Sequence, residues 1–187
     1  MKWNNHSNLE GKHAFLSPSQ PSWHNYDYEH LKDRWINERA KEHGTKIHSI
    51  AADLIKENIK LPKSSKTLNA YVNDAIGYRM DPEIKLYYSD ICFGTADAIQ
   101  FYEKKKLLRI HDLKTGITKP HMEQLMTYAA LFCLEYHYKP SEIKIELRIY
   151  QNDEIQAYEP EPEEIIRIMD LIIDDDNHID NFIKEGL

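Results

Sequence analysis

The chain has 187 residues, which suits a single domain and is long enough to bury a hydrophobic core. Its net charge of −7 argues against a uniformly basic nucleic-acid-binding protein, and no apolar run suggests a membrane span or a secretory leader. Two cysteines are too few for a disulfide framework, so we expect a reduced, cytoplasmic setting.

The negative charge is concentrated at the C-terminal end of the sequence. Residues 153–187 contain 12 Asp or Glu against two Lys or Arg, a balance of −10, which leaves +3 for residues 1–152. A phosphate-binding groove needs local positive charge and not a high overall charge. The balance is therefore compatible with a nucleic-acid ligand, although an ordinary mixed surface would explain it equally well.

The first part of the chain predicts an arm followed by two helices. Residues 1–25 include a stretch rich in Ser and Pro and predict an N-terminal arm without regular structure. A helix is expected over 27–43, with Asp27 as its N-cap. Gly44 predicts a break, after which a second helix runs over about 45–59.

Hydrophobic periodicity divides the rest of the chain into further helices and strands. We expect helices over 67–79, 120–138 and 160–187, the last of them acidic, and strands over 85–88, 94–102, 107–114, 143–150 and 155–158. Three successive lysines between the second and third strands predict a hairpin turn, which makes these strands antiparallel neighbours. The order predicts an α/β fold with a central mixed β-sheet flanked by helices.

Charged residues follow apolar ones on a single face of the strand over 107–114. Because side chains alternate along a strand, Leu108, Ile110, Asp112 and Lys114 share that face. The hairpin brings Asp97 near Asp112, and two close carboxylates repel unless a cation lies between them. Oxygen ligands suit Mg²⁺ or Mn²⁺. We therefore expect a metal-dependent site in which the lysine steadies a developing charge or helps to deprotonate a water.

Two other charged strand residues are expected to lie outside this site. His111 precedes Asp112 on the opposite face of the strand and is interpreted as structural. Arg148, on the strand over 143–150, is interpreted as an exposed strand arginine, with a phosphate contact as the alternative.

Four short motifs occur in one order along the chain: Gly44-Thr45-Lys46-Ile47-His48, Gly94-Thr95-Ala96-Asp97, Asp112-Leu113-Lys114, and Gln124 with Tyr128. Together they resemble the PD-(D/E)xK nuclease superfamily and, within it, the RecB-like exonuclease branch. Stretches around 23–27 and 72–79 are similar to small phage-encoded members of that branch. The resemblance implies a restriction-endonuclease-like core, with 1–187 as a single nuclease domain in a bacterial or phage-infected cell.

The resemblance also implies a role for each motif residue. Asp97, Asp112 and Lys114 would be catalytic, and Gln124 and Tyr128 would position the DNA. The implied ligands of Mg²⁺ or Mn²⁺ are His48, Asp97, Asp112 and the backbone carbonyl of Leu113. Some RecB-like nucleases hold an iron–sulfur cluster with four cysteines, so a chain with two is expected to have none.

The expected function is that of a divalent-metal-dependent DNA nuclease, an exonuclease in recombination, repair or phage DNA processing. The expected partner is DNA, and a homo-oligomer or a larger recombination complex stays open. Two alternatives remain: an endonuclease of the same fold, and a module that binds DNA or protein without cleaving. Against the second, every implied catalytic position holds a competent residue. From its helix alone, His48 is also compatible with an ordinary hydrogen-bonded core histidine.

Overall fold

The structure is a computed structural model that describes residues 4–11, 13–116 and 118–186. The chain divides into two compact units, Met1–Glu42 and His43–Leu187. Within the described residues, no helix has both the length and the apolar composition that crossing a membrane requires.

The first unit has no buried residue among those that the structure describes. It contains the short 3-10 helices η1 (Ser7–Leu9) and η2 (Pro21–Asn25) and the start of helix α1 (Tyr28–Lys56). Asp27 caps α1, as predicted, because its Oδ1 accepts a hydrogen bond of 2.9 Å from the backbone N–H of His30.

Helix α1 is continuous, so the predicted break at Gly44 was wrong. A glycine inside a helix costs about 1 kcal/mol relative to alanine. Here the position is buried, and a Cβ built on Gly44 would lie 2.8 Å from Oγ1 of Thr115. The glycine therefore allows the loop after the third strand to approach the helix closely and does not end it.

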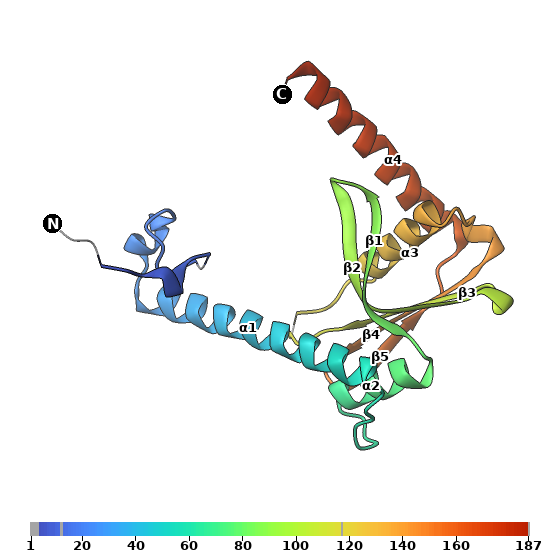
Figure 1. The fold of residues 1–187 in the computed structure, drawn as a ribbon, viewed down its shortest axis with the longest axis horizontal. Helices are drawn as coiled ribbons and strands as arrows, with labels where there is room; N and C mark the ends of the chain where they lie inside the picture. Colours follow the sequence, from blue (N-terminus) through green and yellow to red (C-terminus); the bar gives the residue numbers. More distant parts are fainter. Residues whose placement is uncertain (1–3, 12, 117, 187) are drawn as a thin grey trace. The chain divides into compact units, whose positions relative to one another are not determined.

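Five strands form one mixed sheet in the described part of the second unit, in the order β1-β2-β3-β4-β5 (Figure 1). Their bounds are β1 Asp81–Ser89, β2 Cys92–Tyr102, β3 Leu107–Leu113, β4 Lys144–Gln151 and β5 Glu154–Tyr158. The β3–β4 pair is parallel and the other pairs are antiparallel. The α/β class and the hairpin between β2 and β3 are thus confirmed.

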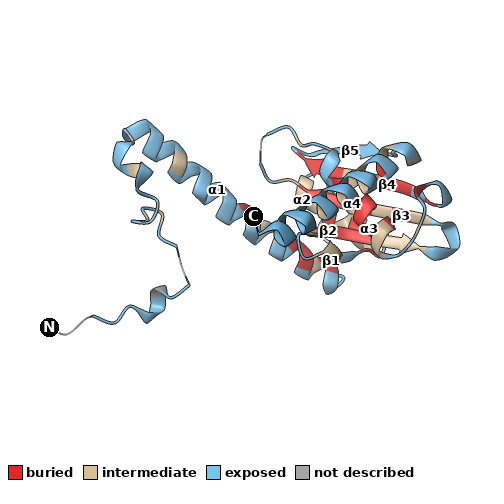
Figure 2. Cartoon of the chain, turned by 90° about the horizontal axis from the view of Figure 1, so that it is seen from above, coloured by how far each residue is buried: buried red, intermediate tan, exposed pale blue. Residues whose placement is uncertain are grey.

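The remaining helices of this unit are α2 (Thr67–Gly77), α3 (Glu123–Glu135), α4 (Pro162–Glu185), η3 (Glu103–Lys105) and η4 (Pro140–Glu142). One buried cluster joins the strands to α3 and α4, and a second joins them to α2 and the end of α1. The buried residues accordingly gather in the sheet and in the helices that cover it (Figure 2).

Strand β1 is longer than predicted because it begins at Asp81 and not near residue 85. Pro82 lies between the helix predicted over 67–79 and the strand predicted over 85–88, yet proline is tolerated on an edge strand, where no ladder hydrogen bond is lost. β1 is such an edge strand, with β2 as its neighbour. The extension places Glu83 within the sheet.

Arg148 and His111 both lie on the sheet close to α2. The interpretation of Arg148 as exposed was wrong: it is 21% exposed and pairs with Glu146 at 2.7 Å and Asp74 at 3.5 Å. His111 is fully buried, and its Nδ1 lies 3.3 Å from the hydroxyl of Tyr150. Burial lowers the pKa of His111 well below its ordinary value, which keeps the ring neutral, as a structural histidine requires.

Candidate metal centre

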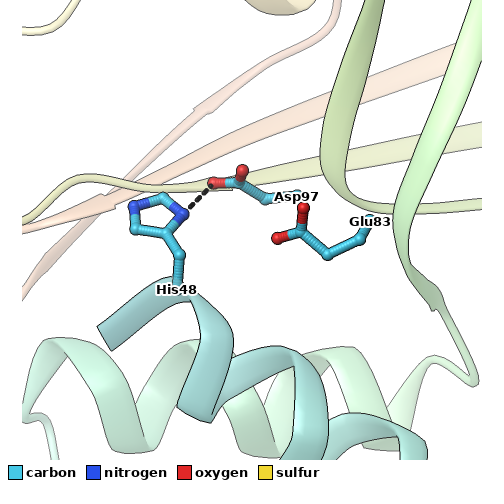
Figure 3. A group of neighbouring side chains, drawn as sticks. All are labelled: His48, Glu83 and Asp97. Atoms are coloured by element: carbon cyan, nitrogen blue, oxygen red, sulfur yellow. Dashed lines mark ion pairs between the residues drawn. The ribbon is translucent and has the colours of Figure 1, made fainter. Parts of the chain in front are cut away.

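Three potential metal ligands converge in the second unit from three different elements. His48 comes from α1, Glu83 from β1 and Asp97 from β2, and one ligand atom of each lies within 4.8 Å of the others. Figure 3 shows the three side chains pointing toward one another, with His48 Nδ1 3.3 Å from Asp97 Oδ2. One imidazole nitrogen and two carboxylates form a donor set that suits Mn²⁺ or Mg²⁺.

Glu83 is a potential ligand that the sequence analysis missed. The pairs on either side of it, Pro82 with Ala98 and Ile84 with Ala96, place it opposite Asp97 in the ladder. Its φ of 56° is left-handed, a conformation that costs a non-glycine residue about 1–2 kcal/mol. Strained backbone of this kind is concentrated at functional sites. The available signal was an acid directly after Asp81-Pro82 and two residues before the strand predicted over 85–88.

Asp97, in the middle of β2, ties that strand to the end of β3. Ala98 pairs with His111, so the next pair along the ladder would be Asp97 with Asp112. Asp97 Oδ2 accepts a hydrogen bond of 2.9 Å from the backbone N–H of Leu113. This bond fixes the carboxylate against the end of β3. Ligation by the carbonyl of Leu113 stays a prediction.

Asp112 and Lys114 form an ion pair at the end of β3. The lysine Nζ lies 3.1 Å from one carboxylate oxygen and 3.2 Å from the other. Asp112 is only 3% exposed, and burial, reinforced by the charge of Asp97, raises the pKa of its carboxyl group. Lys114 and His48 oppose that rise. Asp112 is outside the three-ligand cluster, but its charge also acts on His48.

A chain of hydrogen bonds continues from Lys114 to helix α3. Lys114 Nζ donates to Gln124 Oε1 at 2.7 Å, and Gln124 Nε2 donates to the hydroxyl of Tyr128 at 3.3 Å. The Tyr128 ring lies against β2, where a Cβ on Gly94 would come within 2.8 Å of it. Gly94 thus leaves the space that the Tyr128 ring occupies.

The cluster carries excess negative charge that a cation would neutralise. Asp97 raises the pKa of His48, first through the contact between the two side chains and then through its charge. Burial and the charge of Asp97 raise the pKa of Glu83. The charge of Asp97 therefore favours the protonated forms of both His48 and Glu83.

Open space flanks Lys114 on two sides. One cavity of about 380 Å³ is bordered by Lys114, Thr67 and Leu68, and another of about 300 Å³ by Lys114, Lys119 and Gln124. Lys114 is therefore accessible from both cavities.

The structure brings the predicted residues into two connected groups, His48 with Asp97, and Asp112 with Lys114, Gln124 and Tyr128. It adds Glu83 to the first group. Their catalytic, metal-binding and DNA-positioning roles stay predictions. Comparisons of the chain with protein-family models, curated proteins and solved structures found no match.

Proposed function

We propose that the protein is a divalent-metal-dependent DNA nuclease of the PD-(D/E)xK type, and specifically a RecB-like exonuclease. One observation carries the proposal: a His–Glu–Asp cluster from α1, β1 and β2 lies beside a buried Asp–Lys ion pair at the end of β3, the strand next to β2. A structural ion pair would explain Asp112 and Lys114 alone. It would not explain three further ligand groups on adjoining elements, one of them on strained backbone.

The residues fit a divalent metal. His48, Glu83 and Asp97 would hold it, with Asp112 as a further carboxylate next to them. When bound, Mg²⁺ or Mn²⁺ would polarise the scissile phosphate and lower the pKa of a water molecule. The paired Leu113 N–H keeps Asp97 oriented, since a carboxylate that is already hydrogen-bonded loses less freedom when it binds a cation.

Lys114 is the proposed charge-stabilising group of the reaction. Asp112 and Gln124 hold its ammonium from two sides, so it is fixed before substrate binds. Tyr128 orients Gln124, and this pair would position the DNA strand beside the lysine. The enzyme would then act in recombination, repair or phage DNA processing.

Cleavage of end-labelled linear DNA and closed circular DNA, single- and double-stranded, with Mg²⁺ or Mn²⁺, tests the proposal. We expect degradation of linear DNA only, abolished by Asp112→Ala and by Lys114→Ala. The matched control Lys104→Ala changes an exposed lysine of η3 and should cleave normally. Cutting of circles with the same mutational pattern would indicate an endonuclease. No cleavage, or cleavage that both substitutions leave intact, would favour a module that only binds.

A further inference from the structure

A further cavity lies near the turn of the β2–β3 hairpin, five residues along β2 from Asp97 and five residues along β3 from Asp112. It measures about 430 Å³ and lies between the end of α2 and the hairpin. Three cationic side chains line it, Arg79, Lys105 and Arg109, together with the rings of Tyr78 and Tyr102. Among the described residues, none that lines this cavity is acidic.

Arg109 forms the rigid wall of this cavity. Glu146 holds its guanidinium through two hydrogen bonds of 3.0 and 2.7 Å, and the guanidinium lies 3.8 Å from the centre of the Tyr78 ring. The side chain is only 12% exposed. Arg109 is thus held in place by paired contacts, as an arginine that stabilises the fold would be, and it does not by itself indicate a ligand.

Arg79 and Lys105 differ from Arg109 because both are exposed and the described contacts do not neutralise either charge with an acid. Arg79 has a left-handed φ of 54°, and the Gln100 side chain donates a hydrogen bond of 2.6 Å to its carbonyl. The adjacent Tyr78 carbonyl accepts a hydrogen bond from the hydroxyl of Tyr102. The left-handed φ is that of a helix C-cap, because the backbone N–H groups of Arg79 and Met80 donate to the carbonyls of Ile76 and Ala75, so the end of α2 holds Arg79 in place beside the cavity.

We propose that this cavity binds the phosphodiester backbone of the DNA, a few nucleotides from the bond that is cut; the inference rests on the proposed function. Two exposed cations over a concave, ring-lined wall suit an extended polyanion. The cavity and the metal centre are also linked by a short stretch of chain. Arg79 and Glu83 are four residues apart, which is at most about 14 Å of backbone and about four nucleotides of a helical strand.

Binding of fluorescently labelled single-stranded DNA, measured by anisotropy in EDTA so that nothing is cleaved, tests the inference. The oligonucleotide is about 20 nucleotides long, which is enough to span from the metal centre to the cavity. The variants are Arg79→Ala, Lys105→Ala and the control Lys104→Ala, which removes the same charge from the same turn but does not line the cavity.

We expect Arg79→Ala and Lys105→Ala each to weaken binding of the oligonucleotide about 3- to 10-fold. Each should also reduce the slope of log affinity against log salt by about 0.7, the value for one lost phosphate contact on a single strand. The thermal melting temperature should not change. Lys104→Ala should behave like the unmodified protein.

Two results would overturn the inference: unchanged binding in both cavity variants, or equal weakening by Lys104→Ala. Competition by inorganic phosphate at constant ionic strength distinguishes a site for the DNA backbone from a site for free phosphate. A site for free phosphate would be displaced at low concentration, which contradicts the proposal, whereas a backbone site would not. The assay needs no catalysis, so a protein that binds as expected but never cleaves would refute only the proposed nuclease function.

Discussion

At the scale of single residues, Glu83 connects the backbone geometry of the protein to its chemistry. It combines a left-handed φ of 56° with a carboxylate that faces His48 and Asp97. Glutamate is an unfavourable choice for such a backbone, and the repulsion from Asp97 makes it less favourable still. A residue that is costly in two ways is expected where its side chain has a function.

Two substitutions of Glu83 separate the cost of its left-handed backbone from the cost of its charge. Glu83→Gly and Glu83→Ala both remove the carboxylate, but glycine adopts the left-handed conformation without a Cβ clash. We expect the glycine variant to be about 1 kcal/mol more stable than the alanine variant in chemical denaturation without metal. Mn²⁺ should raise the melting temperature of the unmodified protein and of neither variant. Equal stability of the two variants would contradict the strain, and retained Mn²⁺ stabilisation would contradict the ligand role.

At the scale of elements, glycines mark two close approaches that position the site. Gly94 allows the Tyr128 ring of α3 to lie on β2. Gly94→Ala should displace that ring and reduce DNA cleavage about as much as Tyr128→Ala does, by roughly 10-fold or more, since both disturb the support of Gln124. Combining the two changes should cost no more than either alone. Additive losses would show that the two residues act independently.

Gly44 allows a similar approach between α1 and the loop after β3. Gly44→Ala should destabilise the protein because its Cβ would meet Thr115 Oγ1 at 2.8 Å. In a Thr115→Ala background the same change should stabilise it by up to about 1 kcal/mol, since alanine is the better helix former. Urea denaturation of the unmodified protein, the two single variants and the double variant measures this change of sign. A Gly44→Ala effect of one sign in both backgrounds would contradict the proposed contact.

Most elements could be predicted from the sequence because their hydrophobic patterns are local. The hairpin after Tyr102 followed from apolar alternation on both sides of three lysines, and it correctly made Asp97 and Asp112 neighbours. Glu83 and the continuity of α1 could not be predicted in the same way. Pro82 is tolerated because β1 is an edge strand, and Gly44 is retained because of Thr115. Both reasons depend on segments distant in sequence.

At the scale of the whole molecule, the two units differ in how they are stabilised. Both hydrophobic clusters consist of residues from the second unit, whereas the described residues of the first unit are all at least partly exposed. Burial of apolar surface is the dominant stabilising term in folding. The second unit should therefore carry nearly all of the free energy of unfolding.

A shortened chain of residues 37–187 tests this division and keeps an extra helical turn before the second unit. We expect it to unfold cooperatively, with a melting temperature within about 5 °C of that of the full chain. Differential scanning calorimetry measures both properties. A broad transition, or a much lower melting temperature, would mean that the first unit contributes to the core.

The central claim is that Glu83, His48 and Asp97 hold the metal ion that DNA hydrolysis requires. The most direct test is the Mn²⁺-dependent rate of nucleotide release from end-labelled linear DNA by Glu83→Gln, next to the unmodified protein and the control Glu103→Gln, an exposed acid in η3. We predict a loss of at least about 100-fold for Glu83→Gln and none for the control. Unimpaired nucleotide release by Glu83→Gln would contradict the claim.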